Sequence, residues 1–195
     1  MKTLRSLFFL AVILLAVRGV QATTVIPPTF DQLVGQAQLI FQGSVTDVKS
    51  QWIGEGAQRH IVTYVTFQIE DSLKGDAGSS YTIRMLGGTV GDQTMEVSDS
   101  PKFKVGDDDI LFVENNGSQF IPLVGIMHGR FHVQKDAQTN ADVVTSEHGE
   151  PLGDLSKLGK EEPATNGGDV GAPIAKSLPL SEFKTAIHAK LDEAH

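Results

Sequence analysis

The stretch from Ala37 to Gly75 decides the fold class of this chain. It reads AQLIFQGSVTDVKSQW over residues 37–52 and, after a short loop, HIVTYVTFQIEDSLKG over residues 60–75. Apolar and polar residues alternate in both segments, which is the pattern of a β-strand with one buried face. β-branched and aromatic residues, which favour strands, dominate the second segment. We therefore predict two long strands joined by a loop, the second with one face made of Ile61, Thr63, Val65, Phe67 and Ile69.

Shorter strands follow this pair, each bounded by a turn signal. Alternation over residues 81–85 stops at a Gly-Gly pair, and the apolar run 110–113 begins after a Gly-Asp turn. Asn115-Asn116-Gly117 is a hairpin signal, because Asn and Gly tolerate positive φ. Many short strands without a helix of crossover length predict a mainly β protein, a sandwich or a barrel. The remaining strands are expected at 120–126, 129–135 and 143–145.

Two helices flank the predicted strands. Thr29 and Gln32 have the spacing of a capping box and predict a short N-terminal helix. Residues 148–178 are rich in Gly, Pro and charged residues, and we expect them to form a flexible linker. Residues 179–195 then predict a C-terminal amphipathic helix, one face of which carries Phe183, Ile187 and Leu191.

The first 22 residues have the pattern of a signal peptide. Lys2 and Arg5 precede an apolar run over residues 7–17, which is too short to span a membrane, and a small-residue cleavage site ends at Ala22. We therefore expect a secreted or periplasmic protein. The predicted organisation is a signal peptide at 1–22, a β-barrel domain at 23–147, the linker at 148–178 and the helix at 179–195.

Charge and cysteine content exclude several classes of function. The formal net charge is −8, and loss of Lys2, Arg5 and Arg18 with the signal peptide would leave 13 basic residues against 24 acidic ones. This balance of −11 disfavours nucleic acid and anionic membranes as partners, because phosphate binding needs a basic surface. The chain has no cysteine, which excludes thiol catalysis and cysteine-based metal sites. We expect no cofactor.

The pattern A-x-L-I-F-x-G-x-V, then V-T-F-x-I-x-x-x-L-K-G, an alternating strand and a Gly-Asp turn before I-L-F-V, resembles a known family. It is similar to the OB-fold of the tissue-inhibitor-of-metalloproteinase and netrin-like superfamily. It also resembles bacterial secreted proteins of uncharacterised function that share this barrel pattern and add a Leu-x-x-Phe helix, like Leu180 to Phe183 here. Covering Thr29 to Val144, the resemblance implies a closed OB-like barrel of five to seven strands with an N-terminal and a C-terminal helix. The inhibitors of that superfamily chelate zinc through an N-terminal cysteine, which Thr23 does not replace.

A row of basic side chains is the first candidate site. On a strand, His128, Arg130 and His132 would share one face. Such a row would suit an anion site or a hydrolase, and the alternative is a solvent-facing polar row. At the usual rise the two histidines lie about 13 Å apart, too far for one metal ion. The chain has no H-E-x-x-H or G-x-S-x-G signature.

Trp52, Arg84 and the loop from Gly87 to Pro101 are the second candidates, because an OB barrel binds through one sheet face and the adjoining loops. Trp52 falls in the loop between the two long strands, where it is either a binding anchor or a cap on the barrel end. Arg84 shares a strand face with Thr82 and Leu86, which is either a ligand-binding face or the solvated outer face.

The sequence therefore favours a secreted, non-enzymatic binding module for a protein, peptide or glycan partner. One alternative is a protease inhibitor or regulator that acts through the mature N-terminus and the barrel rim. The other is a hydrolase that uses the His128/Arg130/His132 row.

Overall fold

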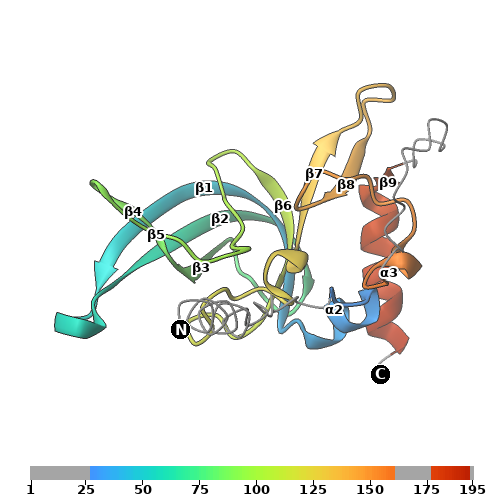
Figure 1. The fold of residues 1–195 in the computed structure, drawn as a ribbon. Helices are drawn as coiled ribbons and strands as arrows, with labels where there is room; N and C mark the ends of the chain where they lie inside the picture. Colours follow the sequence, from blue (N-terminus) through green and yellow to red (C-terminus); the bar gives the residue numbers. More distant parts are fainter. Residues whose placement is uncertain (1–26, 161–176, 194–195) are drawn as a thin grey trace, which may run out of the picture.

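The computed structural model describes residues 27–160 and 177–193 and has a mainly β fold (Figure 1). The expected signal peptide, the mature N-terminus at Thr23 and residues 161–176 of the expected linker lie outside the described residues. The helices are α2 (Phe30–Gln36) and α3 (Leu180–Glu193), with short 3-10 turns η1 (Gly56–Gln58), η2 (Ile126–Gly129) and η3 (Leu155–Lys157). The strands are β1 (Leu39–Ile53), β2 (His60–Lys74), β3 (Ser80–Leu86), β4 (Gly88–Val90), β5 (Gln93–Met95), β6 (Asp108–Val113), β7 (Arg130–Lys135), β8 (Asp142–Ser146) and β9 (Leu178–Pro179).

The main sheet has seven strands, all antiparallel, in the order β3-β2-β1-β6-β7-β8-β9. A second sheet consists of β4 and β5 alone. The prediction of a closed barrel is wrong for the described residues, because β3 and β9 are the outer strands of the sheet and do not pair with each other. The loop after β6 satisfies the edge of β3 in place of a strand: Asn116 Oδ1 accepts from the Arg84 amide at 3.0 Å, and the Phe120 carbonyl accepts from the Leu86 amide at 2.7 Å.

The two long strands predicted from Ala37–Gly75 form a hairpin that extends away from the rest of the sheet (Figure 1). β1 pairs with β2 as far as Ile53 opposite His60, with a bulge between Val45 and Asp47. On its other edge, β1 pairs with β6 only through Leu39–Ser44. A bulge bends a strand and increases its twist, which is consistent with the curved hairpin. The outer half of β1 is therefore paired on one side only.

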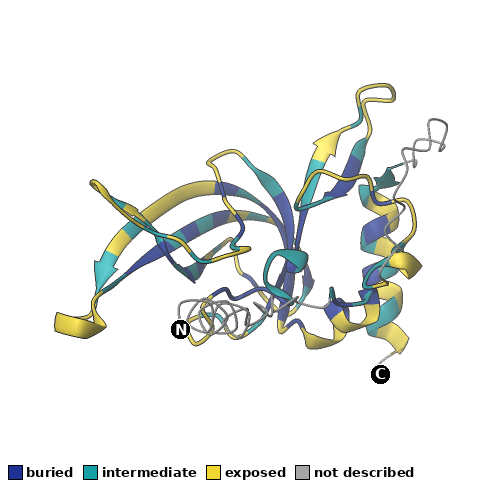
Figure 2. Ribbon diagram, in the orientation of Figure 1, coloured by how far each residue is buried: buried dark blue, intermediate teal, exposed yellow. Residues whose placement is uncertain are grey.

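The sheet separates two apolar cores. Ile40 belongs to the core beneath α2 and α3, whereas its neighbour Phe41 belongs to the core on the other face, because successive strand side chains point to opposite faces. Buried residues are concentrated where β1, β2 and β6 meet, and the hairpin tip is exposed (Figure 2). The second core includes Val65, Phe67, Ile83, Met85, Phe103 and Leu111.

Both predicted helices are present. Thr29 and Gln32 form the predicted capping box, with the Gln32 amide donating to Thr29 Oγ1 and the Thr29 amide donating to Gln32 Oε1. α3 packs on the protein's own sheet: Phe183 is fully buried, and its ring centroid lies 5.1 Å from that of Phe131. No helix in the described ranges is long and apolar enough to cross a membrane.

Two local expectations differ from the structure. Residues 120–126 form no strand of the sheet, because Gly125 and Ile126 both have positive φ and lead into η2. Leu152, within the expected flexible linker, is 8% exposed and belongs to the α2–α3 core, where Leu155 and Leu158 pack against it. These leucines recur every three residues and supply the apolar contacts that hold the first part of that segment on the domain.

Candidate functional site

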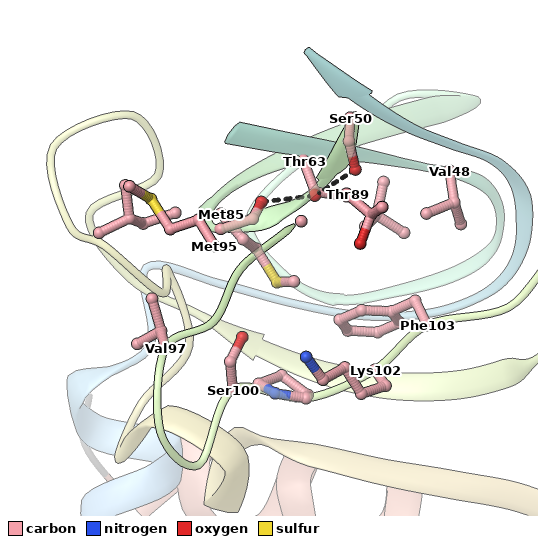
Figure 3. Close-up of a pocket in the computed structure, with 15 residues that line it drawn as sticks. Val48, Ser50, Thr63, Met85, Thr89, Met95, Val97, Ser100, Lys102 and Phe103 are labelled. Carbon is pink, nitrogen blue, oxygen red and sulfur yellow. Dashed lines mark hydrogen bonds between the residues drawn. The ribbon is translucent and has the colours of Figure 1, made fainter. Parts of the chain in front are cut away.

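A pocket of about 260 Å³ lies between the face of β1–β3 and the segment from Leu86 to Phe103 (Figure 3). Ser50 and Thr63 lie on the strand side of this pocket, and Ser100 and Lys102 lie on the opposite side. The pocket brings together side chains from β1, β2, β3, β4, β5 and the loop before β6. Its apolar walls are Val48, Val65, Met85, Met95, Val97 and Phe103.

A pair of hydroxyl groups forms the polar part of the strand side. Ser50 lies opposite Thr63 across the β1–β2 ladder, and their hydroxyl oxygens are 2.8 Å apart. Thr63 Oγ1 donates to the Gly87 carbonyl at 2.7 Å, so its single proton is used there. The proton between the two hydroxyls must therefore come from Ser50, which leaves the Ser50 oxygen free to accept from a ligand.

Gly88 allows the chain to pass directly over this hydroxyl pair. Its φ is +133°, and a Cβ there would overlap both Thr63 Oγ1 and Ser50 Oγ. The Gly-Gly pair at 87–88 is thus a loop of close approach, and glycine is required at residue 88 for two independent reasons. The backbone at Gly88 therefore bounds the pocket on the side of β4.

A buried arginine holds the opposite wall in place. Arg130 is 1% exposed; its Nη1 donates to the Lys102 carbonyl at 2.9 Å, and its Cζ lies 3.9 Å from the centroid of the Phe103 ring. Two consecutive residues of the pocket wall are therefore fixed by one guanidinium group. Because a planar guanidinium both stacks on a ring and donates in fixed directions, Lys would not reproduce this arrangement.

Three carboxylates compensate the charge of Arg130. Asp109, which is fully buried, accepts from Arg130 Nε at 3.0 Å and from Nη2 at 2.9 Å. Asp107 accepts from Nη2 at 2.7 Å, and Glu147 lies 3.4 Å from Nη1. A buried guanidinium with this many partners stabilises one arrangement of β6, β7 and the preceding loop.

His132 completes this network. Its Nδ1 lies 2.8 Å from Asp109 Oδ1, and its Nε2 lies 3.3 Å from the Glu147 carbonyl. The hydrogen bond to Asp109 raises the pKa of His132 above its usual value, whereas burial raises the pKa of Glu147. Both ring nitrogens of His132 are thus engaged within the protein.

The predicted row of basic residues is formed only in part. Arg130 and His132 share a face of β7, as predicted, and contact the same carboxylate. His128 lies in η2, before the strand begins, so it does not extend the row. It is half-buried, and burial lowers its pKa. The positive φ at Gly125 and Ile126 starts the η2 turn and displaces His128.

The other two candidate residues do not line the pocket. The prediction that Trp52 lies in the loop is wrong, because β1 continues to Ile53 and pairs Trp52 with Ile61. The Arg59 guanidinium lies 4.5 Å from the centroid of the Trp52 ring. Arg84 lies opposite Tyr64, one residue out of phase with Thr63 and Met85, so it points to the other face of the sheet. There its Nη1 donates to the Gly117 carbonyl at 3.2 Å.

The loop from Gly87 to Pro101, which includes Met95, was predicted as part of a binding surface, and it lines the pocket. Ser50, Met85 and Lys102 were not predicted as site residues, because they come from separate segments. In the part of the chain that the structure describes, no group of three or more His, Asp or Glu side chains has the geometry of a metal site.

The chain was also compared with known proteins. No protein-family model matches it, and neither the curated proteins nor the solved structures searched include a similar chain.

Proposed function

We propose that this protein is a secreted or periplasmic, non-enzymatic binding module and that the pocket between β1–β3 and the Leu86–Phe103 segment is its ligand site. The observation that carries the proposal is the composition of that pocket. Apolar walls surround a hydroxyl pair with a free acceptor, the combination of many sites that bind ligands by shape and a few polar contacts.

The ionisable groups around the pocket favour binding over catalysis. Among the described residues that line it, Lys102 is the only ionisable one, and neither a carboxylate nor an imidazole faces the cavity. Hydrolysis needs a positioned acid, base or nucleophile with an accessible reactive atom. Arg130 and His132, the remaining candidates for such chemistry, are engaged by Asp109 and Glu147 behind the pocket wall.

The ligand classes that suit the pocket are proteins, peptides and glycans. The mature chain proposed here carries a net negative charge, which disfavours nucleic acid and anionic membrane surfaces. The inhibitor alternative depends on residues 23–26, which lie outside the described residues.

The experiment presents the mature chain, from Thr23, with two sets of probes: a phage library that displays random peptides of about eight residues, and an array of immobilised glycans. Probes that bind are then tested on two variants of one loop. Ser100→Trp fills the pocket, and Ser98→Trp adds the same bulk to an exposed position that does not line it.

We expect Ser100→Trp to weaken binding at least about tenfold, and Ser98→Trp to leave the affinity within about twofold of the parent. The proposal fails if no probe of either class binds, or if a bound probe is insensitive to Ser100→Trp while that variant remains folded by circular dichroism.

A further inference from the structure

The outer half of β1 has an open edge beside the pocket. From Thr46 to Ile53, β1 pairs with β2 on one side, and no described residue forms a backbone hydrogen bond with its other side. The strand next to it, β6, begins only at Asp108, because the chain leaves the sheet in a turn over Lys104–Asp107. Within residues 27–160 and 177–193, no strand therefore continues the line of β6 beside the last eight residues of β1.

The hydrogen-bond alternation shows which backbone groups face this edge. In β2, Ile61 and Ile69 bond towards β3, since Ile61 accepts from Gly87 and Ile69 donates to Ser79. The even-numbered residues of β2 must then bond to β1, where their partners are Asp47, Lys49, Gln51 and Ile53. The amide and carbonyl groups of Val48, Ser50 and Trp52 consequently point to the open edge.

Two of these edge residues also line the pocket. Val48 and Ser50 present their side chains to the cavity and their backbone groups to the vacant position. A row of backbone donors and acceptors at strand spacing is matched by another extended polypeptide, whereas a glycan has no such repeat. A residue placed opposite Val48 or Ser50 would direct its own side chain to the same face, towards the pocket.

A second copy of β1 conflicts with this edge in two of the antiparallel registers that keep the same face in common. The antiparallel register that pairs Asp47 with Lys49 of the copy would place the copy's Ile53 against Gly43, where Asp109 of β6 already lies. A shift of the copy by two residues keeps the side chains of Val48 and Ser50 on the pocket face of both copies. This shift places Lys49 against Lys49 of the copy, which is a repulsive contact. A register with Ser50 opposite Ser50 of the copy places the copy's Ile53 against Asp47 and avoids both conflicts, so the sedimentation test below includes a second copy as the alternative occupant. A short segment without a hairpin of its own fits every one of these registers.

We propose that the β1 edge from Thr46 to Ile53 binds an extended peptide segment as an added strand, with one aliphatic or aromatic side chain of the peptide in the pocket. This inference rests on the proposed function, because it names the ligand class of the same pocket. The backbone ladder supplies affinity, and the apolar walls select the side chain.

The test uses a peptide selected from the random library on the mature chain. Val48→Pro removes an amide that faces the open edge and that the β1–β2 ladder does not use, a position where an edge strand tolerates proline. Val48→Thr is the matched control, because it keeps the amide and the β-branched shape. In parallel, two versions of the peptide are N-methylated at alternate residues, which leaves the protein unchanged.

We expect Val48→Pro to weaken binding at least about tenfold and Val48→Thr to weaken it less than about threefold. Only one of the two N-methylated peptides should lose affinity, because alternate amides of an added strand face β1. If Val48→Pro does not fold, the N-methylated peptides decide the question on the parent chain.

Three results would overturn strand addition. They are selection of no peptide, equal binding of both N-methylated peptides, and a Val48→Pro-sensitive dimer in sedimentation, which would make a second copy the occupant. Failure of the proposed function itself looks different, since then neither a peptide nor a glycan would bind, or Ser100→Trp would leave binding unchanged.

Discussion

Replacement of Arg130 by Met should strongly destabilise the protein, since it removes the cation that three carboxylates share. Asp109, fully buried, would keep His132 as its only side-chain partner. Loss of one member of a buried ion pair costs about 3–5 kcal/mol, because the remaining charge is left uncompensated. Asp107 and Glu147 are 26% and 15% exposed and can be partly rehydrated, so Asp109 accounts for most of the cost.

Urea unfolding at pH 7, followed by far-ultraviolet circular dichroism, measures this cost. With a denaturant slope of about 2 kcal/mol/M, the midpoint should fall by roughly 1.5–2.5 M. The control is Arg59→Met, which removes an exposed arginine that stacks on Trp52 and should cost less than about 1 kcal/mol. Adding Asp109→Asn to Arg130→Met should cost less than the sum of the two single changes, because the two residues interact directly. A loss below about 1 kcal/mol for Arg130→Met would refute the reasoning.

Three further outcomes follow from buried or shifted groups. The pKa of His132 is raised above 6.5, so His132 stabilises the folded state below pH 6.5, and this contribution is lost as the pH rises through the folded pKa. His132→Gln should therefore flatten the fall in the urea midpoint as the pH rises above 6.5. Burial raises the pKa of Asp108 from 3.8 to about 6, so the free energy of unfolding falls as the pH rises from 3.8 through 6. Asp108→Asn should therefore raise the free energy of unfolding at pH 7 by roughly 1–2 kcal/mol, after discounting for solvent screening. An unchanged urea midpoint would contradict this. Phe183→Ala should cost about 3–5 kcal/mol in the same assay, whereas a helix that did not pack on its own sheet would lose almost nothing.

Local patterns in the sequence predicted the parts of the fold that depend on neighbouring residues. The alternation from Ala37 to Gly75 corresponds to β1 and β2, and the Thr29–Gln32 spacing corresponds to the observed capping box. Barrel closure was not predictable in this way, because it depends on whether two distant edges meet. Here Asn116 and Phe120 accept hydrogen bonds from the outer amides of β3, and no local sequence pattern predicts those contacts.

The site was harder to predict than the fold. The alternation of strand side chains predicted that Arg130 and His132 share one face of their strand. Their burial could not be predicted, because it depends on Asp109, which lies on another strand. His128 was misplaced because positive φ at a non-glycine residue, Ile126, cannot be read from its type. The pocket itself combines six separate segments, and of these only the loop from Gly87 to Pro101 was predicted as part of a binding surface.

The measurement that tests the central claim most directly is methionine methyl NMR of the mature chain with a selected peptide. Met85 and Met95 line the pocket, whereas Met127 lies in η2 and does not, so the protein carries its own control. The account predicts that saturating peptide shifts the Met85 and Met95 methyl signals and leaves the Met127 signal in place. A bound peptide that shifts Met127 alone, or none of the three, would contradict it.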